Sequence, residues 1–110
     1  MKTLTTQQLK QHLRTDGMTL VNTLSPTDYE KAHIPNSVNI PNEDADFVQR
    51  VEDIIGGKDQ PVAVYCASKQ CRSSEQAAEK LEKAGFKDVY DYEGGMQEWQ
   101  QAGEKVVVSR

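Results

Sequence analysis

The sequence predicts an α/β domain built on an open, mostly parallel β-sheet with helices on both faces. Three observations lead to this fold class. Helix and strand patterns alternate along the chain, which is typical of a parallel sheet. The apolar run at residues 61–65 is continuous, as expected for a strand buried on both faces. The length of 110 residues suits one domain, which we expect to cover residues 1–110.

The composition limits the kinds of partner that the chain can have. The net charge is −4, and no basic stripe indicates a nucleic acid. The apolar stretches are far shorter than a membrane span, and the N-terminus lacks the apolar core of a signal peptide. We therefore expect a cytoplasmic protein with neither nucleic-acid nor membrane partners, and we take it to be a monomer.

The first half of the chain contains two helix signals and two strand signals. Thr5 and Gln8 have the spacing of a capping box, which predicts a helix that begins there. Residues 18–22 then read as a strand. Ser25 followed by a proline is a strong helix start, because the hydroxyl caps the helix and proline suits its first position. Residues 37–40 form a short predicted strand.

The middle of the chain predicts a helix and then the central strand. Apolar residues from Phe47 to Ile55 share one helical face, and the glycine pair at residues 56–57 ends this helix. The acidic residues of the segment 43–46 are expected in its first turn, where carboxylates offset the helix dipole. The buried strand at residues 61–65 follows.

The last third predicts a helix, a strand and a second, shorter helix. Ser73 or Ser74 is expected to cap the first helix, which Gly85 ends. Residues 88–91 read as a strand, and a glycine pair then leads to a short helix that carries Trp99, an expected core residue. The tail at residues 105–109 is either a strand or loose.

Chemistry is expected at Cys66, because it directly follows the central strand. Sites in parallel sheets form beyond the carboxyl ends of the strands. Backbone N–H groups of the loop and the start of the next helix supply partial positive charge there, and Lys69 and Arg72 add full charges. Each contribution favours the thiolate, so we expect a lowered pKa and a nucleophilic sulfur inside an anion-binding cradle.

The cysteine count excludes two structural explanations for this loop. Cys66 and Cys71 are the chain's two cysteines, which are too few for a secreted disulfide scaffold of this size. Structural zinc needs four ligands, and His12 and His33 lie far away in sequence. A reactive thiol, a redox pair and inert packing therefore remain open from the residues alone.

Three segments of the chain resemble the rhodanese family. They are residues 20–41, which contain the run from His33 to Pro35, residues 64–78, and residues 85–99 with their glycine pair and Trp99. They occur in the family's order and cover nearly the whole chain. The resemblance implies the rhodanese fold and a catalytic cysteine at Cys66, which carries a persulfide between two half-reactions. In this family context His33 is expected to be structural rather than an acid–base group.

The chain departs from the family pattern at several positions. Asn22 and Leu24 stand where the family usually has Asp and Arg, and the loop after Cys66 is longer than in typical short sulfurtransferases. Five residues separate Cys66 from Arg72, which is the spacing of rhodanese-fold phosphatases and arsenate reductases. However, Tyr65 replaces the histidine that usually precedes the phosphatase cysteine, and no acidic residue of the loop offers itself as a proton donor for a leaving alcohol.

The leading hypothesis is a sulfurtransferase without a metal or an organic cofactor. Cys66 takes a sulfane sulfur from a small anionic donor, such as thiosulfate or a persulfide, and a thiol acceptor then removes it. Cys71 is either a resolving thiol or a plain small side chain. The alternatives are a phosphatase or arsenate reductase that uses Cys66 and Arg72, and a non-enzymatic redox-sensing or binding module. The expected substrate-binding loop consists of Ala67, Ser68, Lys69, Gln70, Arg72 and Ser73.

Overall fold

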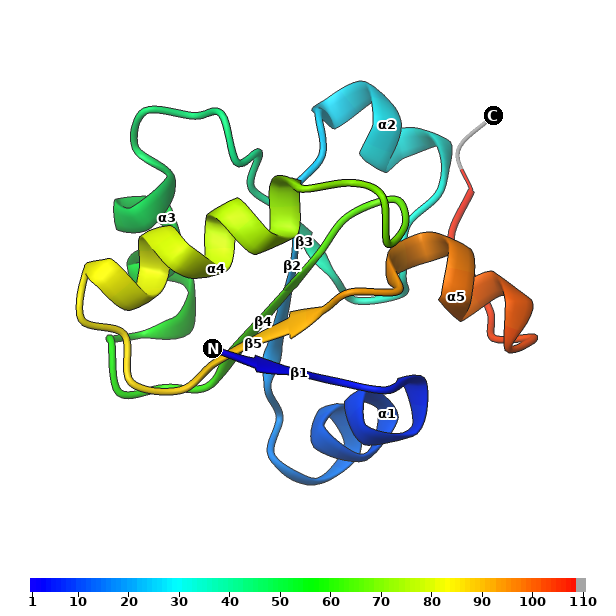
Figure 1. Ribbon diagram of the computed structural model, residues 1–110, viewed down its shortest axis with the longest axis horizontal. Helices are drawn as coiled ribbons and strands as arrows, with labels where there is room; N and C mark the ends of the chain where they lie inside the picture. The colour runs from blue at the N-terminus through cyan, green and yellow to red at the C-terminus, as the bar shows by residue number, and fades with distance from the viewer. Residues whose placement is uncertain (109–110) are drawn as a thin grey trace.

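A computed structural model of the chain describes residues 1–108 and has the predicted parallel sheet with helices on both faces (Figure 1). All neighbouring strands are parallel, and their order across the sheet is β1-β5-β4-β2-β3. The predicted central strand, β4, therefore has a partner on each side. The strands are β1 (Lys2–Thr3), β2 (Thr19–Asn22), β3 (Val38–Asn39), β4 (Val62–Tyr65) and β5 (Val89–Tyr92).

The helices lie in two layers, with the sheet between them. In Figure 1, α3 and α4 lie on one side of the sheet, and α1 and α5 lie on the other. Of the described residues, none belongs to a helix that is both long and apolar enough to cross a membrane. The helices are α1 (Thr6–Thr15), α2 (Pro26–Lys31), α3 (Phe47–Ile55), α4 (Ser73–Lys83) and α5 (Gly95–Gln101).

Each face of the sheet has its own hydrophobic core, which explains why β4 is apolar throughout. Ala63 and Tyr65 point into the core under α1 and α5, whereas Val62 and Val64 point into the core under α3 and α4. Trp99 is buried in the first core, as predicted. A strand whose side chains are all buried fits only at the centre of a sheet that is covered on both sides.

The predicted helix starts at α1 and α2 are confirmed in detail. The Thr5 hydroxyl accepts a hydrogen bond from the Gln8 N–H at 3.1 Å, and the Gln8 side chain accepts one from the Thr5 N–H at 2.9 Å. The Ser25 hydroxyl accepts from the Asp28 N–H at 3.2 Å, with proline at the first helical position. At the end of α3, Gly56 adopts the left-handed conformation with φ of 87°. Short sequence patterns were sufficient to predict these helix ends, because the hydrogen bonds that form them join residues that are close together in the chain.

Two expectations about helix starts were wrong. Neither Ser73 nor Ser74 caps α4, because the helix begins at Ser73 itself and Arg72 occupies the cap position without a side-chain hydrogen bond. The acidic segment 43–46 lies before α3 rather than in its first turn. Asp44 instead forms an ion pair with Arg50 across the start of that helix.

The two ends of the chain also differ from expectation. β1 was not predicted, because Lys2 and Thr3 form an exposed two-residue edge strand with no apolar pattern. In the tail, residue Val107 forms an isolated antiparallel bridge with His33 rather than part of a longer strand. Ser109, the end of the expected tail strand, lies outside the described residues.

A glycine at the start of α5 lets that helix approach the end of β4. Gly95 has φ of 60°, and a Cβ atom there would overlap the carbonyl oxygen of Cys66. We expect Gly95→Ala to lower the free energy of unfolding by about 3 kcal/mol, because it adds both left-handed strain and a backbone clash. The matched control is Gly103→Ala, which has φ of 79° but open space around the new atom, and should cost about 1 kcal/mol.

Urea unfolding followed by circular dichroism measures both changes. Equal losses in the two variants would show that the close approach at Gly95 adds nothing beyond its backbone conformation.

Candidate active site

Hydrogen bonds from both neighbouring strands fix the first residues of the loop after β4. The Thr23 N–H donates to the carbonyl of Tyr65 at 3.0 Å, from the end of β2. On the other side, backbone N–H groups at the start of α5 donate to the carbonyls of Cys66 and Ala67, both at 2.9 Å. Three consecutive carbonyl groups are thus held in place. This leaves the Cys66 side chain on the side of the sheet that α4 covers.

The Cys66 thiol is fully buried and faces hydrogen-bond acceptors. Its Sγ donates toward the carbonyls of Cys71 at 3.4 Å and Ser68 at 3.9 Å, and toward the Ser74 hydroxyl at 3.6 Å. Burial, followed by the neighbouring Cys71, raises the pKa of Cys66 to about 11. The expected lowering of its pKa was therefore wrong, because burial and the neighbouring Cys71 thiol outweigh the hydrogen bonds from Ser74.

Backbone N–H groups of the expected cradle reach both thiols: that of Ser74 faces Cys66, and those of Ser73 and Ala67 face Cys71. Burial acts to raise the pKa of Cys71, yet hydrogen bonds from the Cys66 thiol and from the backbones of Ser73 and Ala67 lower it overall. Cys71 is also half-buried rather than fully buried. Of the two thiols, Cys71 therefore loses its proton at the lower pH, and Cys66 keeps its proton longer.

Cys71 opens onto a cavity of about 310 Å³ beside the loop. Cations and carboxylates share its wall, so it has no uniform charge. Arg72 points toward Glu75, with a distance of 2.6 Å between their charged atoms, and its side chain is 75% exposed. The cavity is lined by Lys69, Gln70, Cys71, Arg72, Ser74, Glu75, Asp91 and Glu93.

The six expected substrate-binding residues thus have different positions. Lys69, Gln70 and Arg72 line the cavity with Cys71. The carbonyls of Ala67 and Ser68 accept hydrogen bonds that hold the loop, and Ser73 lines a second cavity on the other side of the loop.

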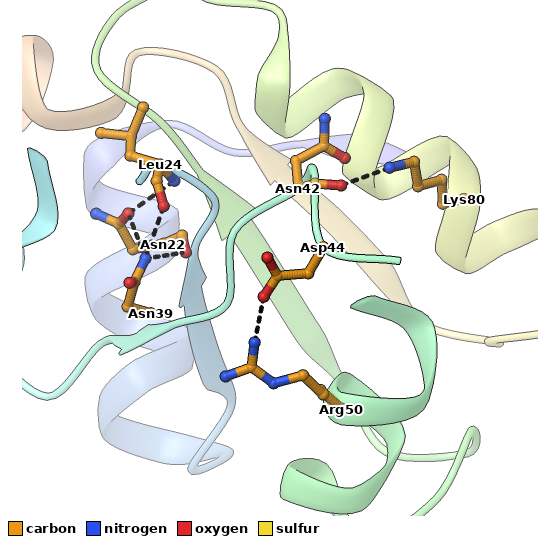
Figure 2. A network of polar contacts seen from close by, with 7 residues as sticks. All are labelled: Asn22, Leu24, Asn39, Asn42, Asp44, Arg50 and Lys80. Carbon is orange, nitrogen blue, oxygen red and sulfur yellow. Dashed lines mark hydrogen bonds and ion pairs between the residues drawn. The ribbon is translucent and has the colours of Figure 1, made fainter. Parts of the chain in front are cut away.

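This second cavity, of about 450 Å³, is bordered by loops that follow β2 and β3. Figure 2 shows how amide side chains fasten these loops: Asn39 donates to the Leu24 carbonyl at 2.8 Å, and the Leu24 N–H donates to the Asn22 side chain at 2.9 Å. In the same view, Lys80 of α4 donates to the Asn42 carbonyl at 2.6 Å. The two departures from the family pattern, Asn22 and Leu24, are therefore part of one hydrogen-bonded support.

His33 is engaged away from this loop, in keeping with the expected structural role. Its Nδ1 lies 2.9 Å from the Tyr29 carbonyl, and its ring stacks on that of Tyr29 at 3.8 Å. The neighbouring Ile34 N–H donates to the Tyr65 hydroxyl at 3.0 Å, which ties this segment to β4.

Sequence reasoning missed Ser74, which lies beside Cys66, and Asp91, which lines the cavity next to the loop. Ser74 was interpreted as a helix cap, but its hydroxyl faces the Cys66 sulfur. Asp91 of β5 was not considered, although it lines the cavity, is only 3% exposed, and has a buried Oδ1 without a hydrogen-bond partner. An acidic residue inside an apolar strand pattern is the signal that would have identified it. The loop thus does have a nearby carboxyl group, contrary to expectation.

Comparisons with known proteins agree on one family. The family model described as rhodanese-like domain matches residues 5–102. The chain is 38% identical to a thiosulfate sulfurtransferase GlpE of Pseudomonas syringae over 81% of this chain and 78% of that protein. It is 32% identical to the protein of the same name from Pseudoalteromonas translucida, over 96% of this chain and 95% of that protein.

A solved structure gives the same result for the fold. The structure titled rhodanese with anions from E. coli has a TM-score of 0.68 and 25% identity, and the match covers 84% of this chain and 99% of that one. The relatives support sulfurtransferase activity in general.

The two thiols should differ strongly in reactivity. At pH 7 we expect iodoacetamide to alkylate Cys71 at least about a hundredfold faster than Cys66, because the pKa values of the two differ in this direction and Cys71 is accessible. The Cys66 rate should then rise with each pH unit up to about pH 11. Peptide mass spectrometry measures both rates, and protein unfolded in urea is the control. Faster labelling of Cys66 in the folded protein would contradict this description of the pair.

Proposed function

The chain belongs to the rhodanese-like domain family, and from this premise we propose that it is a sulfurtransferase that carries a sulfane sulfur on Cys66. The observation that supports it best is the pair of thiols in the loop after β4. Cys66 is buried, where a persulfide is shielded from water, and Cys71 opens onto the cavity through which a donor can approach. We propose that residues 1–110 act as one domain in this reaction.

In the first half-reaction, Cys66 needs to lose its proton. The Cys71 thiolate, which accepts a hydrogen bond from Cys66, takes that proton. The Cys66 thiolate then attacks the outer sulfur of a small anionic donor such as thiosulfate. A Cys66 S–S bond forms, the S–S bond of the donor breaks, and sulfite leaves with the electron pair. Protonated Cys71 no longer needs the N–H cradle, which is then free to stabilise the anionic persulfide.

In the second half-reaction, a thiol acceptor attacks the outer sulfur and carries it away, and Cys66 becomes a thiolate again. Cys71 provides a second route when no acceptor arrives. Its thiolate attacks the Cys66 sulfur, hydrosulfide leaves, and a disulfide joins the two cysteines. An external thiol then reduces that disulfide.

One observation favours a second function. Asp91 and Arg72 line the same cavity as Cys71, so a carboxyl group and a guanidinium are both available for a tetrahedral oxyanion. However, Arg72 forms an ion pair with Glu75 and points into solvent. Hydrolysis of an aryl phosphate that is lost in Arg72→Ala would support the phosphatase alternative over sulfur transfer.

The thiol pair also permits the redox-sensing alternative. A reversible Cys66–Cys71 disulfide that forms without turnover of any sulfur donor would support it.

Intact mass after incubation with thiosulfate tests the proposed mechanism. We expect a gain of one sulfur atom in the wild type and none in Cys66→Ser, because serine cannot form the persulfide. In Cys71→Ser the added sulfur should persist several-fold longer, because the resolving thiol is missing. Circular dichroism checks that each variant is folded. Added sulfur in Cys66→Ser would contradict the assignment of Cys66, and equal lifetimes in the wild type and Cys71→Ser would contradict the resolving role.

The cations at the cavity should act on donor binding rather than on chemistry. We expect Lys69→Ala to raise the KM for thiosulfate about threefold at low salt with little change in kcat, because this exposed charge attracts the anion from a distance. The matched control is Lys87→Ala, since Lys87 lies before the amino end of β5, whereas Lys69 follows the carboxyl end of β4, and Lys87 pairs with Asp59 at 3.2 Å. The difference between the two variants should vanish at high ionic strength. A fall in kcat at constant KM would assign Lys69 a different role.

A further inference from the structure

The cavity beside Cys71 contains a buried carboxyl group that the protein itself leaves without a partner. Asp91 of β5 lines this cavity and is 3% exposed. Its Oδ1 is buried and, among the described residues, has no hydrogen-bond partner. Burying a polar group without a partner destabilises a fold, so such a group in a native protein needs an explanation. A ligand that supplies the missing partner is one such explanation.

The sheet places Asp91 on the same side as Cys66. Asp91 is paired with Val64 in the register of β4 and β5, and the Val64 side chain points into the core under α3 and α4. Directly paired residues of neighbouring strands point to the same face of a sheet, and side chains alternate along each strand. The carboxyl of Asp91 therefore lies on the α4 side, as does Cys66, two residues after Val64.

The charged side chains of this cavity leave both a positive and a negative group for a ligand. Arg72 and Glu75 neutralise each other, with 2.6 Å between their charged atoms. Lys69, Asp91 and Glu93 take part in none of the ion pairs of the described residues. Burial raises the pKa of Asp91, and the nearby charge of Glu93 adds to this effect. A ligand ammonium group would oppose both effects, while Lys69 suits a carboxylate.

The volume of the cavity and its thiol limit the ligand further. About 310 Å³ is near the lower end of the range of ligand pockets, which begins at about 300 Å³. This volume suits a molecule of the size of an amino acid rather than a peptide. Cys71 opens onto the cavity and its pKa is lowered overall, so a ligand with a sulfur atom can exchange with it.

We propose that this cavity binds a zwitterionic aminothiol, a small amino acid that bears a thiol, with its ammonium group at Asp91 and its carboxylate at Lys69. This ligand is the external thiol that reduces the Cys66–Cys71 disulfide. Its thiolate, formed by loss of a proton to solvent, attacks the Cys71 sulfur. A mixed disulfide forms on Cys71, and Cys66 leaves with the electron pair and takes up a proton. A second ligand thiolate then attacks the sulfur of the bound ligand, and the disulfide of the ligand leaves as Cys71 becomes a thiolate again. The reduction step rests on the proposed function, whereas the binding of the aminothiol does not.

Thiosulfonate reagents of different charge measure how the cavity treats each charge at Cys71. In a Cys66→Ser background, Cys71 is the single thiol, and its rates with the cationic 2-aminoethyl, the neutral methyl and the anionic 2-sulfonatoethyl methanethiosulfonates are compared. The ratio of two rates cancels any change in the pKa of Cys71. We expect Asp91→Asn to lower the cationic-to-neutral ratio about tenfold at low salt, because a buried carboxylate is weakly screened. Lys69→Ala should instead lower the anionic-to-neutral ratio about threefold.

Two further variants separate Asp91 from a general effect of charge. Glu93→Gln removes an exposed carboxylate of the same cavity, so it should lower the cationic-to-neutral ratio only about twofold. Glu79→Gln removes an exposed carboxylate of α4 that lines neither cavity beside the loop, and should leave the ratio unchanged. Asp91→Ser is a second variant that removes the carboxyl group. Thermal melts by circular dichroism show that each variant is folded.

Binding itself is measured with S-methyl-L-cysteine, which carries both charges but has no free thiol. It should slow the reaction of Cys71 with the neutral reagent in a saturable way, because it occupies the cavity. The protection should be lost in Asp91→Asn, which has no charge for the ammonium group. The matched control compound is 3-(methylthio)propionate, which lacks the ammonium group and should not protect.

Three results would overturn the proposal: an unchanged cationic-to-neutral ratio in both Asp91 variants, an equal fall in Glu93→Gln or Glu79→Gln, or no greater protection by S-methyl-L-cysteine than by the control compound. None of these measurements needs a sulfur donor. A failure here would therefore leave sulfur transfer unaffected, and a protein that gains no sulfur from thiosulfate can still bind the aminothiol.

Discussion

The candidate site depends on how closely the start of α5 approaches the end of β4. Gly95 leaves room for the carbonyl group of Cys66, and the N–H groups that follow it bind the carbonyls of Cys66 and Ala67. Thr23 holds the preceding carbonyl from the other side. Because three successive peptide groups are fixed in this way, the Cys66 side chain has one direction available to it, toward α4. The remainder of the loop is free to adopt the conformation that suits its own side chains.

That direction determines the acid–base character of the site. A thiol with a pKa of about 11 is ionised in about one molecule in ten thousand at pH 7, so Cys66 alone is a poor nucleophile. The neighbouring Cys71 changes this situation, because its thiolate is stabilised by the loop backbone and lies within hydrogen-bond reach of Cys66. In the proposed reaction, moving one proton from Cys66 to Cys71 creates the nucleophile without bringing a new charge into the core. The proposed reactivity therefore belongs to the pair rather than to either cysteine.

The sequence was most informative where structure depends on neighbours along the chain. The capping box at Thr5, the proline after Ser25 and the apolar run of β4 each specify a local geometry, and each prediction was confirmed. Burial is different, because it depends on contacts between distant segments. The sequence placed positive charges near Cys66 and predicted a thiolate there, but could not show that the sulfur faces carbonyl groups.

The position of Asp91 also could not be predicted from the sequence, because it depends on a contact between distant segments. It is 25 residues from Cys66 in the chain, and only the pairing of β5 with β4 brings it to the loop. In the same way, the edge strand β1 exists because β5 offers it a partner, not because Lys2 and Thr3 favour a strand. The position of Cys66, the proposed nucleophile, after a buried strand was available from the sequence, whereas the acceptors that surround its sulfur were not. The position of the two thiols has a consequence for the proposed reaction: with Cys66 buried and Cys71 at the cavity, a donor or acceptor that enters this cavity meets Cys71 and the mixed charges around it first. In the proposed reaction, substrates are therefore selected beside Cys71, while the sulfur is transferred at Cys66.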